Sequence, residues 1–90
     1  MQVTVEISLY PLQSDYEESI INFIKALKTY NGIEVYTNAM STQLTGEWSA
    51  VMKAIDIELG KVFHLLDTCS TVIKIVNKKL AIEQGHLDFD

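Results

Sequence analysis

The chain has 90 residues, of which 48% are hydrophobic, and its 12 acidic and 7 basic side chains give a formal net charge of −5. This length makes one domain, residues 1–90, and the acidic balance argues against nucleic acid, because binding to phosphates needs a basic face. All of the basic residues are lysines, so the planar fork with which arginine clamps a phosphate is absent, and a neutral or cationic ligand is easier to accommodate.

The hydrophobic fraction is high for one small domain, and we expect a partner in an oligomer to cover part of the apolar surface. No run approaches the roughly 18 apolar residues of a transmembrane helix, and the N-terminus lacks a basic region followed by an apolar block. The expected location is therefore the cytoplasm, without direct insertion into a membrane. Cys69 is interpreted as a small buried apolar residue, and no spacing of cysteine and histidine is typical of a metal site.

The N-terminal third predicts a strand followed by a helix. Residues 2–10 alternate between apolar and polar side chains, and Pro11 should end this half-buried strand because proline has no amide hydrogen to donate. Ser14 and Glu17 form a capping-box pair that begins a helix, and apolar residues then recur at helical spacing until the helix ends near Tyr30. The apolar stripe of this helix consists of Tyr16, Ile20, Phe23, Ile24 and Leu27.

Residues 35–48 predict a hairpin that leads into a second helix. Residues 35–37 and 40–45 favour strands, and the two residues between them favour a turn. Helical spacing of apolar residues then continues over residues 48–66. Gly60 lies inside this helix, where it favours a kink or close packing against another helix.

The β-branched residues of 68–77 predict a last strand, and residues 80–90 form a tail that either docks on a partner or frays. The resulting order is that of the ferredoxin-like fold, an α+β domain in which a four-stranded antiparallel sheet carries two helices on one face. The other face stays open and suits a subunit interface or a ligand site. We expect a salt bridge there between Glu6 and Lys74. The open face should carry Glu6, Ser8, Tyr10, Tyr36 and Lys74.

Several motifs occur in an order and spacing that resemble one repeat of the YkoF-like family, which binds thiamine and its hydroxymethylpyrimidine moiety. The motifs are SLYPL at 8–12, Asp15, VYT at 35–37, STQLTG at 41–46 and Val51. The resemblance implies a ferredoxin-like repeat with a ligand pocket, which assembles through its sheets into a dimer or a tetramer-like unit. The family's namesake carries two repeats, whereas this chain has one, so a homo-oligomer of separate subunits is expected.

The same resemblance makes the hairpin the candidate binding site. Ser41 and Thr42 have hydroxyls that both donate and accept hydrogen bonds, which suits an aminopyrimidine, although such residues are also ordinary in strands. Adjacent strand residues point to opposite faces, so at most one of the two can face a given pocket. We expect Ser41 to face the pocket, on the face of Tyr36, and Thr42 to point toward the helices or a turn. Asn38 offers an amide to the ring or, alternatively, forms the turn. The absence of an acidic residue or histidine between Thr37 and Ser41 can change the ligand preference.

Aromatic side chains complete the candidate site. Tyr10, Tyr36 and Trp48 can stack on a flat heteroaromatic ring or face a thiazolium cation, or they belong to a core or an interface. Ser8 and Thr37 lie in the motifs that carry the resemblance. The candidate ligand-binding residues are therefore Ser8, Tyr10, Tyr36, Thr37, Asn38, Ser41, Thr42 and Trp48.

Two classes of function remain open. The first is a non-catalytic binding protein for thiamine or hydroxymethylpyrimidine in thiamine salvage or transport, with no cofactor beyond this ligand and a transporter component as a candidate partner. The second is a regulatory or structural oligomerisation module with a different effector at the subunit interface. An enzyme is not expected, because the sequence contains no activated nucleophile and no Gly-rich phosphate loop, although a cofactor-free oxygenase would need mainly a pocket.

Overall fold

The computed structural model describes residues 1–84, and its secondary structure follows the predicted order. Residues 85–90 of the predicted tail lie outside the described part of the chain. The elements are β1 (Gln2–Pro11), α1 (Glu17–Leu27), β2 (Glu34–Thr37), β3 (Thr42–Glu47), α2 (Trp48–Leu65), β4 (Cys69–Val76) and a 3-10 turn, η1 (Ile82–Gln84).

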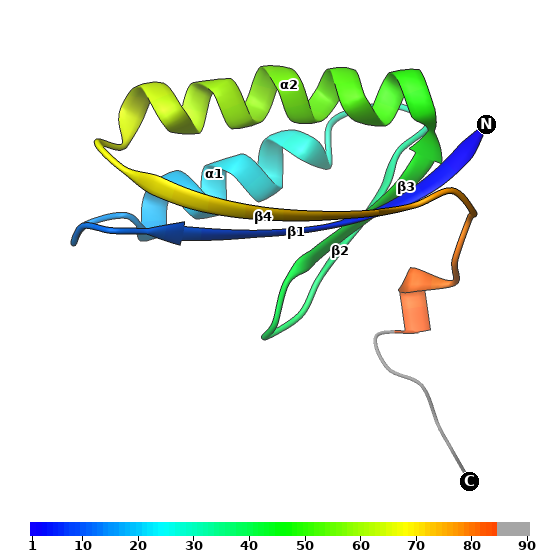
Figure 1. Ribbon diagram of the computed structural model, residues 1–90, viewed down its shortest axis with the longest axis horizontal. Helices are drawn as coiled ribbons and strands as arrows, with labels where there is room; N and C mark the ends of the chain where they lie inside the picture. Colours follow the sequence, from blue (N-terminus) through cyan, green and yellow to red (C-terminus); the bar gives the residue numbers. More distant parts are fainter. Residues whose placement is uncertain (85–90) are drawn as a thin grey trace, which may run out of the picture.

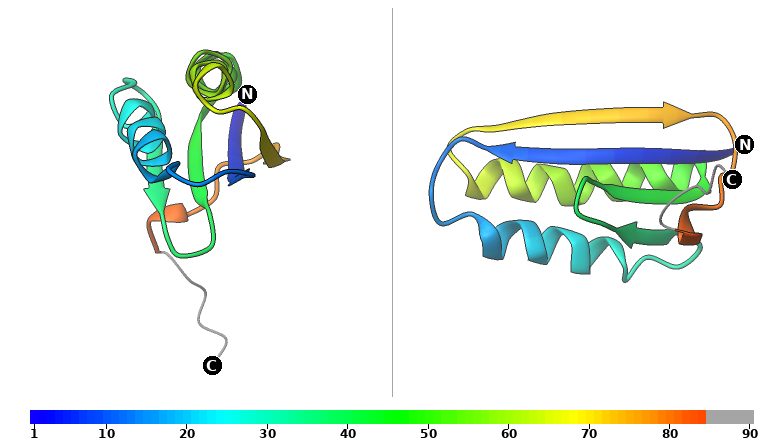
Figure 2. Two further views of the ribbon diagram at one scale, coloured as in Figure 1. Left: turned by 90° about the vertical axis from the view of Figure 1, so that its left-hand side faces the viewer. Right: turned by 90° about the horizontal axis from the view of Figure 1, so that it is seen from below.

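The four strands form one antiparallel sheet in the order β2-β3-β1-β4, and both helices cover the same face of it (Figures 1 and 2). β1 lies in the interior of the sheet and pairs with β3 on one side and β4 on the other. The ferredoxin-like α+β fold predicted from the sequence is therefore confirmed. We call the face under the helices the helix side and the opposite face the open face.

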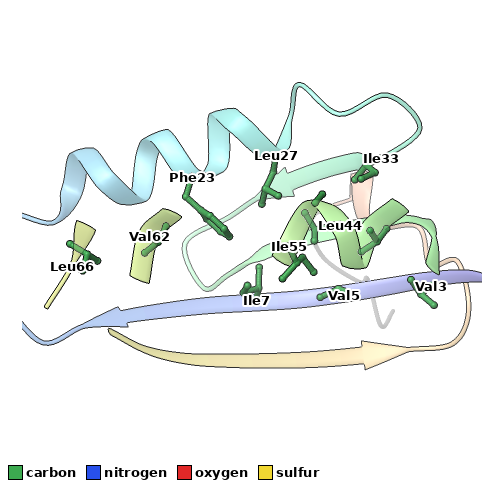
Figure 3. Packing of buried hydrophobic residues seen from close by; sticks show 12 residues of the cluster. Val3, Val5, Ile7, Phe23, Leu27, Ile33, Leu44, Ile55, Val62 and Leu66 are labelled. Carbon is green, nitrogen blue, oxygen red and sulfur yellow. The ribbon is translucent and has the colours of Figure 1, made fainter. Parts of the chain in front are cut away.

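The core lies between the sheet and the two helices (Figure 3). The alternation along β1 turns Val3, Val5 and Ile7 to the helix side, where they are almost fully buried. The apolar stripes of α1 and α2 close over them, as the helical spacing predicted. Cys69, which was expected to be buried, is only half-buried and packs against the edge of this core. The helices contribute Phe23, Leu27, Val51, Ala54, Ile55 and Val62.

The ends of α1 differ from the prediction. The capping box of Ser14 and Glu17 does not form, because the helix begins only at Glu17 and its N-cap, Tyr16, makes no side-chain capping hydrogen bond. The helix also ends earlier than expected, at Leu27. There the amide and the hydroxyl of Thr29 both donate to the carbonyl oxygen of residue 26, which tightens the last turn.

A hydrogen bond fixes the chain beyond α1 to α2. The hydroxyl of Tyr30 donates to Oε2 of Glu58 at 2.6 Å, and Nζ of Lys61 lies 3.5 Å from Oε1 of the same carboxylate. Glu58 is only 6% exposed, so these partners compensate the burial of its charge. The hydrogen bond to Glu58, together with desolvation, raises the pKa of Tyr30 above its ordinary value.

Close packing occurs at Gly46 and not at Gly60, where the sequence suggested it. A Cβ added to Gly46 would lie 2.8 Å from the carbonyl oxygen of Gly32 and 3.2 Å from Cγ2 of Val51. A Cβ at Gly60 would meet nothing within 4 Å, and α2 runs without interruption past it. The absence of a side chain at Gly46 therefore lets the loop before β2 approach the end of β3 closely.

The beginning of the tail folds onto the chain's own open face. The hydroxyl of Thr4 donates to the carbonyl oxygen of Lys78 at 2.8 Å and accepts from the amide of Leu80 at 2.9 Å. Ile82 of η1 is buried, and so is Thr45, which lies opposite Thr4 in the sheet. Figure 1 shows η1 on the side of the sheet away from the helices. One end of the open face is thus already covered within the monomer.

Candidate functional site

A cavity forms where the strands of the sheet differ in length. β1 pairs with β3 only as far as Ile7, which lies opposite Thr42, whereas its pairing with β4 continues to Pro11. Beyond Ile7, β1 therefore has no strand on its β3 side, and the tip of the β2–β3 hairpin and α1 border a cavity of about 300 Å³ that is partly open to solvent. The lining residues are Ile7, Ser8, Leu9, Tyr10, Ile20, Phe23, Ile24, Thr37, Asn38, Ala39, Met40, Ser41 and Thr42.

The cavity has apolar walls and no charged side chain. Ile20, Phe23 and Ile24 line it from α1, and Ile7 and Leu9 line it from β1. Neither a lysine nor a carboxylate occurs among the lining residues. Apolar walls with a few polar groups are typical of small-molecule sites, and the absence of charge favours a ligand, or a part of one, that is neutral.

A pair of hydroxyls supplies polar groups at the hairpin. Thr42 lies opposite both Ile7 and Thr37, so the sheet alternation turns these three side chains to the helix side. The Oγ1 atoms of Thr37 and Thr42 are 2.9 Å apart, and either can donate to the other. One hydroxyl hydrogen is used between them, which leaves the second hydrogen and the remaining lone pairs for a ligand. The pair can therefore both donate and accept.

The backbone of β1 adds a second donor and acceptor. The amide of Leu12 donates to the carbonyl oxygen of Thr68, next to the last pair of the β1–β4 ladder. In an antiparallel sheet the backbone groups of successive residues point to opposite neighbours. The N–H and C=O of Leu9 therefore point away from β4, toward the side on which β3 has already ended. Leu9 lines the cavity, so these groups are placed to meet a ligand.

Asn38 shapes the hairpin turn. Its side-chain Oδ1 accepts from the backbone amides of Met40 and Ser41 at 2.8 and 3.1 Å. The backbone amide of Asn38 donates to the carbonyl oxygen of Ser41. This is the turn-forming role that the sequence offered as the alternative to ligand binding. The turn also delays the second strand, which begins at Thr42 rather than at residue 40. Since the side-chain oxygen is occupied, the side-chain nitrogen is the group that Asn38 can still present.

The open face carries a separate polar network beside the hairpin tip. The hydroxyl of Ser41 donates to Oε2 of Glu6 at 2.9 Å and accepts from Nε2 of Gln43 at 2.8 Å. Nζ of Lys74 lies 3.4 Å from Oε1 of Glu6, which confirms the predicted salt bridge. Tyr36 lies opposite Gln43 on this face and is 40% exposed. Ser41 thus lies on the Tyr36 face and Thr42 on the helix side, as the alternation predicted. The cavity, however, is lined from α1 and lies on the helix side, and not on the Tyr36 face where Ser41 was expected to meet the ligand.

The structure brings together most of the sequence-predicted site residues, but two lie elsewhere. Tyr36 lies on the open face and does not line the cavity; Ser8 and Tyr10 do line it, although the alternation along β1 turns their side chains to the open face. Trp48 begins α2 at the opposite end of β3 from the hairpin tip, and its amide donates to the carbonyl oxygen of Met1. The predicted residues that line the cavity are Ser8, Tyr10, Thr37, Asn38, Ser41 and Thr42.

Sequence reasoning missed the apolar wall of the cavity. The helical spacing predicts Ile20, Phe23 and Ile24 as a core stripe. Phe23 and Ile24 do pack in or against the core, and all three residues also line the cavity. The usable signal was the difference in strand length, since β1 has 10 residues and β3 has 6. A long strand beside a short hairpin leaves part of its edge without a partner.

Within residues 1–84, no cluster of histidine, cysteine, aspartate and glutamate is arranged to hold a metal ion. Over the same range, none of the helices combines the length and the apolar character needed to cross a membrane.

Comparison with known proteins gives one family match and several similar structures. A family model described as "Thiamine-binding protein" matches residues 5–84. A hypothetical protein of Methanocaldococcus jannascii is 28% identical, with a TM-score of 0.74 over 93% of this chain and 91% of that chain. A protein of Thermotoga maritima, provisionally described as a thiamine biosynthesis/salvage protein, is 19% identical, with a TM-score of 0.78 over 93% and 95% of the two chains. No curated protein matches the chain.

Proposed function

Because the chain belongs to the thiamine-binding protein family, we propose that it binds hydroxymethylpyrimidine, or the pyrimidine half of thiamine, in the cavity between α1, β1 and the hairpin tip. Binding occurs without chemistry, and the chain acts as a carrier in thiamine salvage or transport. The observation that carries the proposal is the uncharged lining of this cavity, which combines apolar walls with the hydroxyl pair of Thr37 and Thr42.

The polar groups of the cavity complement an aminopyrimidine. Such a ring donates from its amino group and accepts at its ring nitrogens. Thr37 and Thr42 together offer a hydrogen and lone pairs, and the backbone of Leu9 offers a further donor and acceptor. The flat faces of the ring would then contact the side chains of Ile20 and Phe23. A volume of about 300 Å³ lies at the lower end of the range for small-molecule sites.

Charge determines which form of the vitamin binds best. A diphosphate group needs cationic partners, and the cavity lining has none, while the chain contains no arginine and has a net charge of −5. We therefore expect hydroxymethylpyrimidine and thiamine to bind more tightly than thiamine diphosphate. The thiazolium ring of thiamine would lie toward the mouth of the cavity.

A ligand panel tests the proposal. Isothermal titration calorimetry and thermal-shift measurements would compare hydroxymethylpyrimidine, thiamine and thiamine diphosphate, because a ligand that binds only the native state raises the Tm by mass action. Amino acids serve as unrelated controls. Failure of both hydroxymethylpyrimidine and thiamine to bind would refute the proposal, and tighter binding of the diphosphate at moderate salt would refute the charge argument.

A further inference from the structure

Ser41 connects the cavity to the open face. It is one of the residues that line the cavity, yet its hydroxyl donates to Glu6 and accepts from Gln43, which both belong to the open-face network. The hydroxyl has one hydrogen, which goes to Glu6, and one of its two lone pairs goes to Gln43. Ser41 is therefore held in place from the face opposite to the proposed ligand.

The hydrogen bond to Glu6 also holds the hairpin tip. Among the side-chain hydrogen bonds that residues 38–41 make within the described chain, it is the one that reaches outside the hairpin. The bonds of Asn38 close the turn on itself. Ladder pairing between β1 and β3 ends at Ile7 and Thr42, just before the tip. The position of the tip relative to β1 therefore depends on the contact between Ser41 and Glu6.

The ion pair between Glu6 and Lys74 does not by itself explain how the hairpin tip is held against β1. The side chains of Lys74 and Glu6 are 69% and 41% exposed, and such exposed pairs contribute little to stability. Lys74 nevertheless restrains the carboxylate from the β4 side while its other oxygen accepts from Ser41. The carboxylate is thus oriented between β4 and the hairpin tip.

We propose that Glu6 is a positioning residue of the binding site: through Ser41 it holds the hairpin tip against β1 and so sets the wall of the cavity, although it does not touch the ligand. The proposal rests on the proposed function of the cavity. It follows that the acceptor oxygen of residue 6, more than its charge, determines how well the tip is held.

Two substitutions at position 6 separate the acceptor from the charge. Glu6→Ala removes the acceptor, whereas Glu6→Gln keeps an oxygen that can accept from Ser41 and loses the ion pair with Lys74. Glu34→Ala is the matched control, because Glu34 is also a sheet glutamate paired with a lysine, Lys79 at 3.6 Å, whereas the hydroxyl of Ser41 donates to Glu6 and not to Glu34. All three variants keep the core residues unchanged.

The first readout needs no ligand. Hydrogen exchange of the Met40 and Ser41 amides, measured by NMR, reports opening of the turn in which both amides are bonded to Asn38. We expect exchange about three- to tenfold faster in Glu6→Ala, as for the loss of one hydrogen bond, and parent-like exchange in Glu6→Gln and Glu34→Ala. The affinity for hydroxymethylpyrimidine should fall by about the same factor in Glu6→Ala only.

Parent-like exchange of the two amides in Glu6→Ala would overturn the proposal. Exchange that is accelerated equally in Glu6→Gln and Glu6→Ala would also overturn it, because the charge of residue 6 would then be the decisive property. A loss of affinity in Glu6→Ala without faster exchange at the tip would likewise overturn it. If the parent chain binds no pyrimidine, the proposed function fails, but the exchange rates still decide whether Glu6 positions the tip.

Discussion

Replacing the hydroxyl of Thr42 by a methyl group tests the proposed contact directly. Thr42→Val keeps the shape of a side chain that is 6% exposed and removes its hydrogen bond with Thr37. In the bound state the pair loses one of its two hydroxyls, so a polar atom of the ligand is left without a partner in an apolar cavity. Such a loss costs about 1–3 kcal/mol, which corresponds to a roughly 5- to 150-fold higher Kd.

Stability should change much less than affinity in this variant. Thr37 is an exposed residue, so its hydroxyl can hydrogen-bond to water after Thr42 is replaced. We expect the free energy of unfolding to change by no more than about 1 kcal/mol. Calorimetric titration with hydroxymethylpyrimidine and urea unfolding, measured on the same preparation, separate the two effects.

Thr45→Val is the matched control. Thr45 lies on the same strand and is 2% exposed, but its hydroxyl donates to the carbonyl oxygen of Val3 at 2.8 Å, far from the cavity. This variant should lose about 1–2 kcal/mol of stability and keep the parent's affinity. Parent-like binding by Thr42→Val, or equal losses of affinity in both variants, would show that the Thr37–Thr42 pair does not contact the ligand.

Three further predictions concern assembly and stability. We expect a dimer or a tetramer, because Tyr10, Tyr36 and Val72 expose apolar surface on the part of the open face that the tail leaves uncovered. Sedimentation that shows only a monomer at micromolar concentration would contradict this expectation. Gly46→Ala should destabilise the fold by about 1–3 kcal/mol, because the added Cβ would clash with the carbonyl oxygen of Gly32. Gly60→Ala should stabilise the fold by up to about 1 kcal/mol, because alanine favours a helix more than glycine does. Urea unfolding compares the two variants. The hydrogen bond to Glu58 raises the pKa of Tyr30 in the folded chain above the ordinary tyrosine value of 10.0. The stability that this hydrogen bond contributes is therefore present below pH 10.0 and is lost as the pH rises through the folded-state pKa. Tyr30→Phe should therefore lose less stability than the parent over that alkaline range, and equal losses in urea unfolding would argue against this linkage.

Several features of the fold were determined by the sequence alone. The alternation of residues 2–10 placed Val3, Val5 and Ile7 on one face of a strand, and the structure buries all three. Helical spacing likewise identified the buried faces of α1 and α2. These predictions succeed because the period of an apolar pattern depends on local backbone geometry and on which side of an element is buried. The order of the elements then restricts the possible topologies to a few.

The cavity and its contacts were decided by tertiary structure. The cavity exists because β3 stops pairing at Ile7 while β4 continues to Pro11. The strand lengths indicate that part of β1 lacks a partner, but only the register of the sheet decides which part. The same long-range pairing engaged the hydroxyl of Ser41 with Glu6, which is 35 positions away in the chain. Hydrogen bonds between residues so distant in sequence depend on register, and register follows from how all the strands and helices pack together.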